Sequence, residues 1–324
     1  MTLTKIADMA GTSVSTVSKA FAGSREISEE TKEHIFEIAR SLGCFDKYYK
    51  APRKNPLIAL MIPEIDSECY GIYASVFERE FRLRGADTIV VSTRFDKERE
   101  AGFFRELAYG MRVDGILLWG SGKLIKNPDE IPLIIFDDAA PESNADSVGM
   151  DLYAAILKLV RTIKEYGHTK VGFIGEGLTV GKAVRFKKAM RKAGLPVHDK
   201  YIYASESRFA KAGEDCIQRL HDSKDMPTVI VAAYDQIAFG AMKRARELGY
   251  RIPEDISFVG MDDISATEYF DIPLSSIHMG YEDVSARICD LMFRKIENKH
   301  YRSREMLIVP VSVNVRESLK RAEA

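Results

Sequence analysis

Apolar residues recur at helical spacing through the first 56 residues, with almost none of the alternation typical of strands. This pattern predicts three helices, each preceded by a residue of a type that caps helix N-termini. We therefore predict an all-helical N-terminal domain over residues 1–46. Its helices span 3–10, 14–21 and 29–42, after Thr2, Ser13 and Ser28.

The pattern changes at Leu57, where short apolar runs begin to alternate with segments of helical periodicity. Such alternation predicts an α/β domain with parallel sheets covered by helices on both faces. The series is long enough for two sheets, so we predict lobes over about 57–155 and 156–280, with the chain after Pro273 crossing back between them. The predicted strands are 57–62, 88–92, 115–119, 133–136, 170–174, 201–204, 228–232, 256–260 and 306–313, and the clearest helices are 71–84, 152–166, 182–193, 236–248 and 283–297.

Charge and hydropathy narrow the class of protein. The chain has 47 basic and 48 acidic residues, which excludes a uniformly basic nucleic-acid binder but allows a local basic patch. No apolar run approaches the roughly 20 residues that span a bilayer, and the N-terminus does not resemble a secretory signal. The four cysteines are far apart in sequence, so we expect reduced thiols. We expect a cytoplasmic protein without a membrane partner.

Basic residues gather in 47–56, where Pro52 and Pro56 limit helix formation. We interpret this segment as a linker between the two domains. Two hypotheses remain open for it: a basic arm in which Arg53 and Lys54 contact phosphates, or an unstructured tether.

Residues 4–19 combine a helix, a turn containing Gly11 and a second helix. On the second helix Val17 and Ala20 or Phe21 can pack inward, three to four residues apart. A short helix with small polar residues and a lysine on its outer face fits a DNA major groove. A three-helix bundle with a solvated face is the alternative. The outer residues of this helix are Val14, Ser15, Ser18 and Lys19.

The run from Ala10 to Lys19 resembles the head of the lactose-repressor (LacI/GalR) family, with Lys19 where the family usually has arginine. The resemblance covers nearly the whole chain. It implies a helix-turn-helix head and a two-lobed, periplasmic-binding-protein-like body over 57–318. It also implies a homodimeric repressor of carbohydrate-utilisation genes that binds double-stranded operator DNA and a small sugar-like effector. The other matching segments are 27–31, 38–43, 166–168, 232–240, 251–263, 273–277 and 315–318.

The resemblance also implies the residues that bind DNA. Lysine lacks the planar fork of arginine, so we expect Lys19 to discriminate guanine less strongly. The linker has no match to the family's minor-groove leucine, which argues against strong DNA bending. By the resemblance, bases are read by Val14, Ser15 and Lys19, and phosphates are contacted by polar residues such as Thr2, Ser13, Thr16 and Ser18.

Residues that follow the predicted strands can face a ligand, because parallel sheets bind ligands at the carboxyl ends of their strands. Tyr70, Trp119, Glu176, Arg208, Tyr234 and Asp262 have such positions. The family's effector contacts map onto Tyr70, Lys182, Arg208, Tyr234 and Asp262.

Asp262 is the strongest of these candidates, because a carboxylate accepts hydrogen bonds from two hydroxyls at once. Asp263 is predicted to be a helix cap. Arg208 suits an anionic effector or is a solvated rim residue. Trp119, the one tryptophan, stacks on a sugar or packs at the lobe interface.

Enzyme motifs are incomplete. Gly120–Lys123 lacks the first glycine and the final Ser or Thr of a phosphate loop, and the last glycine of 175–181 is misplaced for a dinucleotide fingerprint. The histidines have no metal-type spacing, and no serine lies in a nucleophile elbow. We therefore predict no enzyme activity, catalytic residues, metal or cofactor. The alternative function is a sugar-binding protein that does not read DNA. Because only six residues follow the last motif, we expect a dimer rather than a tetramer.

Overall fold

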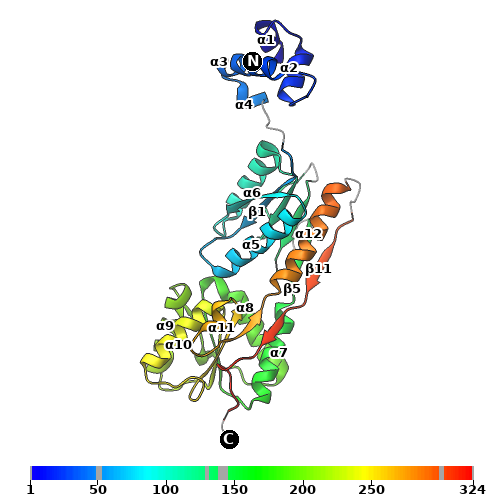
Figure 1. Cartoon of the computed structure of the whole chain (residues 1–324). Coiled ribbons are helices and arrows are strands. Elements are labelled where there is room, and N and C mark those ends of the chain that lie inside the picture. Colours follow the sequence, from blue (N-terminus) through cyan, green and yellow to red (C-terminus); the bar gives the residue numbers. More distant parts are fainter. Residues whose placement is uncertain (1, 49–52, 128–130, 138–144, 299–302, 323–324) are drawn as a thin grey trace. The chain divides into compact units, whose positions relative to one another are not determined.

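The computed structural model describes residues 2–48, 53–127, 131–137, 145–298 and 303–322. The chain divides into two compact units, residues 1–56 and 57–324, which we call the head and the body (Figure 1). No helix in the described ranges has the length and apolar character needed to cross a membrane.

The head is a bundle of four helices: α1 (Leu3–Met9), α2 (Val14–Phe21), α3 (Glu29–Ser41) and the short α4 (Phe45–Tyr48). Ile6, Val17, Ala20 and Ile35 form its core and are fully buried. Ser13 and Ser28 cap α2 and α3 by accepting hydrogen bonds from the backbone N–H groups three residues later. Thr2 makes no such bond, so its predicted side-chain cap is wrong.

The fourth helix is not among the predicted helices, and its second half, Lys47 and Tyr48, lies in the segment predicted as the linker. The rings of Phe45 and Tyr48 pack on Phe21, with centroid distances of 6.2 and 5.7 Å. This aromatic packing extends the head to Tyr48. Residues 49–52 of the predicted linker lie outside the described residues.

The first lobe of the body is a parallel sheet in the order β11-β5-β4-β3-β1-β2. Alternate side chains of its strands point to opposite faces. Ile58, Leu60 and Phe136 face α5 (Glu68–Leu83) and α12 (Tyr281–Glu297), which pack on each other. Ala59 and Met61 face α6 and the π-helix that follows it. The remaining elements are β1 (Leu57–Ile62), β2 (Asp87–Ser92), α6 (Lys97–Arg105), the π-helix (Glu106–Met111), β3 (Gly115–Leu118), β4 (Leu133–Phe136), β5 (Asp146–Met150) and β11 (Met306–Val309).

The second lobe has the sheet order β12-β10-β9-β8-β6-β7, parallel except for β12, which runs antiparallel to β10. One group of helices, α7 and α8, packs together against this sheet, and α9 and α10 form a second packed pair (Figure 1). Short 3-10 turns precede α8 and β7. The elements are α7 (Leu152–Glu165), β6 (Val171–Glu176), α8 (Val180–Ala193), β7 (Ile202–Ser205), α9 (Phe209–Asp222), β8 (Val229–Ala232), α10 (Asp235–Glu247), β9 (Ser257–Asp262), α11 (Ala266–Tyr269), β10 (Ser275–His278) and β12 (Ser312–Asn314).

The two-sheet architecture agrees with the predicted fold class, but three predictions differ from the structure. The strand predicted over 306–313 is two strands, β11 and β12, in different lobes, and the chain crosses between them at Pro310, which has no N–H for a ladder. Strand β5 was missed, because Asp146, Ser147 and Gly149 interrupt its apolar pattern. Helix α7 packs on α8 and on β10 and β12 of the second lobe, whereas the predicted boundary at 155 divides it.

Candidate functional site

Helix α2 has one buried and one exposed side. Val17 and Ala20 are fully buried in the head and Phe21 is 5% exposed. The other residues predicted to read bases or contact phosphates lie outside the core. Thr2, Ser13, Val14, Ser15, Ser18 and Lys19 are exposed, and Thr16 is half-buried.

The start of α2 is held in place by hydrogen bonds between side chain and backbone. The Ser13 hydroxyl accepts a bond from the Thr16 N–H at 3.0 Å and lies 2.9 Å from the Thr16 hydroxyl. Lys19 donates to Glu26 across the following turn, with both side chains exposed. The lysine that we predict to contact DNA is therefore paired with a carboxylate in this structure.

Arg53 and Lys54 precede β1 in sequence, lie outside any helix or strand, and are both exposed. Their exposure is compatible with either of the two hypotheses for the linker.

Several predicted effector residues meet in the second lobe. Lys182, on the first turn of α8, donates to the carbonyl of Ala233 at 2.7 Å and lies 3.7 Å from the carboxylate of Asp262. The Lys182 ammonium is also 6.0 Å from the ring centre of Tyr234. The Tyr234 hydroxyl accepts a hydrogen bond from the N–H of Phe209, the residue next to Arg208. Four of the predicted residues are thus linked by direct or neighbouring contacts.

Asp262 ends β9 in an unusual conformation. Its φ is 111° and that of Asp263 is 56°, values that side-chain-bearing residues rarely adopt and that often accompany functional sites. The Asp262 side chain is 9% exposed. Burial raises its pKa to about 6, although the nearby Lys182 charge acts in the opposite direction.

This raised pKa predicts a pH dependence of stability. Because the folded chain holds the Asp262 proton to higher pH than the unfolded chain, the free energy of unfolding should fall as pH rises from about 4 to about 6. Asp262→Asn should remove this loss and be more stable than the wild type at pH 8, by on the order of 3 kcal/mol. Urea denaturation at pH 5 and pH 8 measures the difference. An advantage of the variant that is larger at pH 5 than at pH 8 would contradict the assignment, and the exposed Asp271→Asn is the control.

Arg208 is paired with two carboxylates in this structure. Its guanidinium donates to both carboxylate oxygens of Glu64 at 2.7 Å, and its Nε donates to Glu176 at 3.1 and 3.2 Å. Glu64 follows β1 in the first lobe, whereas Glu176 ends β6 in the second. Glu64 was not among the predicted site residues, although its position just after β1 is the kind of position that can face a ligand.

Two of the aromatic candidates, Tyr70 and Trp119, belong to the first lobe. Tyr70 and Trp119 make an edge-to-face contact at 4.4 Å, and Trp119 packs in turn on Tyr73 and Phe136. The pKa of the Tyr70 phenol lies well above its usual value because of burial, with smaller contributions from negative charges that include Asp262 and Glu64. Tyr70 therefore keeps its hydroxyl proton beside these carboxylates. Trp119 is part of an aromatic cluster at this site.

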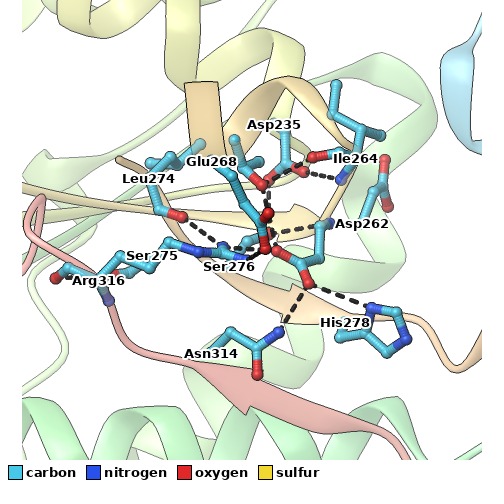
Figure 2. A network of polar contacts seen from close by, with 12 residues as sticks. Asp235, Asp262, Ile264, Glu268, Leu274, Ser275, Ser276, His278, Asn314 and Arg316 are labelled. Atoms are coloured by element: carbon cyan, nitrogen blue, oxygen red, sulfur yellow. Dashed lines mark hydrogen bonds and ion pairs between the residues drawn. The ribbon is translucent and has the colours of Figure 1, made fainter. Parts of the chain in front are cut away.

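Asp263 anchors a polar network at the place where the chain returns to the second lobe. Its carboxylate accepts hydrogen bonds from Arg316, Asn314 and His278 at 2.6, 2.7 and 3.1 Å. Figure 2 labels Arg316, Asn314 and His278 and marks the hydrogen bonds of this network with dashed lines. Asp263 does not accept the N-terminal backbone bonds of α11, so the predicted helix cap is wrong.

Asp235 binds the turn that follows β9 from a second side. It accepts bonds from the Ser276 hydroxyl and the Ile264 N–H, at 2.6 and 2.9 Å (Figure 2). The Asp263 N–H in turn donates to the Ser276 hydroxyl at 3.1 Å. The strained backbone at Asp262 is therefore fixed from both sides.

Comparison with known proteins agrees with this arrangement. The head matches the family model "Bacterial regulatory proteins, lacI family" over residues 2–44, and the body matches "Periplasmic binding protein-like domain" over residues 160–319. The HTH-type transcriptional repressor PurR of Mannheimia succiniciproducens is 25% identical over 334 residues, covering 99% of each chain.

Two solved structures share the fold. The lac repressor dimer bound to operator and the anti-inducer ONPF has a TM-score of 0.71 at 18% identity, covering 98% of each chain. A LacI family transcriptional regulator from Enterococcus faecium with bound ribose has a TM-score of 0.70 at 21% identity, covering 82% of this chain and all of that one. The chain therefore combines a lacI-family DNA-binding head with a periplasmic-binding-protein-like body, and it is a DNA-binding transcriptional regulator with an effector-binding domain.

Proposed function

We propose that the head reads operator DNA with the exposed side of α2. The observation that carries this is a capped recognition helix whose inner side is fully buried while Val14, Ser15 and Lys19 are exposed. Such a helix can enter the major groove without disturbing the bundle. Ser13, Thr16 and Ser18 flank it and supply hydroxyls for phosphates, as Thr2 does from the start of α1. Arg53 and Lys54 would add phosphate contacts from the linker.

Single substitutions on α2 test whether its exposed side contacts the operator bases. A duplex selected by the wild-type chain is the probe, and fluorescence anisotropy measures its affinity. Ser15→Ala and Lys19→Ala should each weaken binding by about tenfold or more and relax the base preference at one position of each half-site. Lys192→Ala, which removes an exposed charge from the body, is the control. Equal affinity of all three variants would contradict the proposed reading.

Glu26→Gln should tighten operator binding by about two- to fivefold. Glu26 holds Lys19 in an exposed ion pair, which must break before the lysine can reach DNA, and its charge repels phosphate. Glu37→Gln removes an exposed negative charge from α3 and is the matched control. Anisotropy titrations of both variants on one duplex measure the effect, and a Glu26→Gln affinity at or below that of the control would refute the competition.

We further propose that the effector is an uncharged sugar bound between the lobes. Asp262 supplies a buried acceptor for hydroxyls, and the Tyr70 and Trp119 rings supply an aromatic surface on the first lobe. Lys182 and Arg208 are both paired with carboxylates, so neither is available for an anionic ligand. Tyr234 contributes a hydroxyl and a ring next to Lys182. The relative that binds ribose supports a sugar as the ligand class.

A thermal-shift panel of neutral sugars and their phosphorylated counterparts tests the ligand class. A neutral sugar should raise the melting temperature, and its phosphate ester should not. The shift should disappear in Asp262→Ala, and Asp271→Ala is the control for loss of an exposed carboxylate. A shift given by phosphate esters alone would overturn the proposal.

The regulator would act as a homodimeric, cytoplasmic repressor without enzyme activity, released from DNA when the effector changes the lobe arrangement. The named repressors among its relatives support repression, rather than activation, as its effect on transcription. The alternative, a sugar-binding protein that does not read DNA, is disfavoured by the exposed, capped helix of the head. Light scattering that gives a monomer or a tetramer would contradict the dimer.

A further inference from the structure

The contact between Arg208 and Glu64 joins the two lobes directly. Glu64 is fixed in the first lobe, because the carbonyl of the preceding Pro63 accepts bonds from the Arg94 N–H and the Ser92 hydroxyl at the end of β2. Arg208 lies between β7 and α9 in the second lobe. The two N–H···O bonds of 2.7 Å form the parallel, two-pronged geometry that makes arginine–carboxylate pairs strong and directional.

The second lobe holds Arg208 ready for this contact. Glu176 accepts from its Nε, and the guanidinium lies 4.5 Å from the ring centre of Phe209. Phe209 itself has a φ of 55°, a costly conformation for a side-chain-bearing residue, and the hydroxyl of Tyr234 accepts its N–H. Three side chains and a strained backbone therefore orient one arginine toward the first lobe.

The burial of the two carboxylates makes the arginine necessary to this arrangement. The side chains of Glu64 and Glu176 are 3% and 2% exposed, whereas that of Arg208 is 35% exposed. Without the guanidinium, two negative charges would be buried close together without a cation, which is strongly unfavourable. Moving the lobes apart would relieve this by admitting water to Glu64.

We propose that Glu64, Arg208 and Glu176 form an interlobe latch that holds the lobes of the body together without a bound effector. The effector then acts on lobes that are already closed, and must work with or displace Arg208. The latch is a property of the body alone. Its consequence for operator affinity rests on the proposed function.

Distance measurement between the lobes tests the latch in the full chain. Ile65→Cys and Glu206→Cys place spin labels on exposed positions beside Glu64 and Arg208, and the four described native cysteines are buried. Labelled chain is diluted with unlabelled chain, so that double electron–electron resonance reports distances within one chain. No small molecule is added. The labelled parent should give one narrow, short distance.

Arg208→Met should shift this distribution to longer distances, and Glu64→Gln should shift it in the same direction by less, because the amide still accepts a hydrogen bond. Arg244→Met is the matched control: Arg244 is 34% exposed and also binds two partners, Gln218 and Glu247, but both are in its own lobe. A parent distribution that is already broad, or an Arg208→Met distribution equal to the parent's, would overturn the latch.

Operator affinity of the same variants separates the two proposals. A longer distance together with altered affinity supports both. A longer distance with unchanged affinity supports the latch and contradicts its proposed coupling to DNA.

Discussion

Asp263→Ala is expected to lower the free energy of unfolding of the body by about 3–5 kcal/mol, because it removes the buried partner of Arg316 and leaves this arginine paired with the exposed carboxylate of Glu268. The Asp263 and Arg316 side chains are only 7% and 14% exposed. Burial acts to raise the pKa of Asp263, but hydrogen bonds from His278, Arg316 and Asn314 outweigh it and lower the pKa to about 2. The carboxylate is therefore strongly favoured in its charged form.

The sign of its pH dependence follows from this lowered pKa. The stabilisation by Asp263 is present above the unfolded-state pKa of about 4 and is lost as pH falls toward 2. Urea unfolding followed by circular dichroism should therefore show the largest difference between wild type and variant at neutral pH. Asp271→Ala removes an exposed partner of Arg246 and should cost at most about 1 kcal/mol. Equal costs for the two variants would mean that the network does not stabilise the fold.

Gly240→Ala is expected to destabilise the second lobe by more than about 3 kcal/mol, at or beyond the upper end for overpacked cores. Helices α9 and α10 approach so closely that a Cβ at Gly240 would overlap the backbone of Ala210. Gly213 on the facing helix has the same constraint, since its Cβ would overlap the backbone of Ile237 and Ala241. A backbone clash cannot be relieved by a change of rotamer, so the helices must separate.

A glycine in an open part of a helix provides the control. A Cβ at Gly71, in α5, meets nothing within 4 Å. Gly71→Ala should therefore stabilise the chain by about 0.5–1 kcal/mol through the higher helix propensity of alanine. Chemical denaturation of both variants gives the comparison, and a Gly240→Ala chain as stable as Gly71→Ala would contradict the close approach of α9 and α10.

The helices of the head could be predicted to within one residue, because periodicity and capping residues act locally. Helix α2 spans Val14–Phe21, as predicted, and the Ser13 and Ser28 caps are confirmed. The short α4 was missed, since two prolines and several basic residues nearby suggested a linker. Its stability comes from the rings of Phe45 and Tyr48 on Phe21, a tertiary contact with no local pattern.

The body could be predicted at the level of two parallel sheets, because continuous apolar strands alternated with helices. The sheet to which each C-terminal strand belongs could not be predicted. Met306–Val309 and Ser312–Asn314 form one β-rich run in the sequence, yet they pair with β5 and β10 of different lobes. Pairing between residues so far apart in sequence depends on the topology rather than on the run itself.

The candidate site likewise contains residues that could be placed from the sequence and contacts that could not. Lys182 and Asp262 were placed by a resemblance, and the structure brings them within 3.7 Å. The ion pair of Arg208 could not be inferred, since its partner Glu64 is 144 residues away in sequence. For the same reason Asp263, judged from its neighbours, seemed to be a cap, whereas its partner Arg316 lies 53 residues further on.

Selection from a random duplex pool by the purified full chain, read by sequencing, tests the central claim most directly. We predict enrichment of a two-fold symmetric site, with two half-sites read by the α2 helices of a dimer. The same selection with Lys19→Ala should lose preference at the position that this residue reads. No enrichment at low salt, either without a ligand or with the sugar panel, would contradict sequence-specific DNA binding.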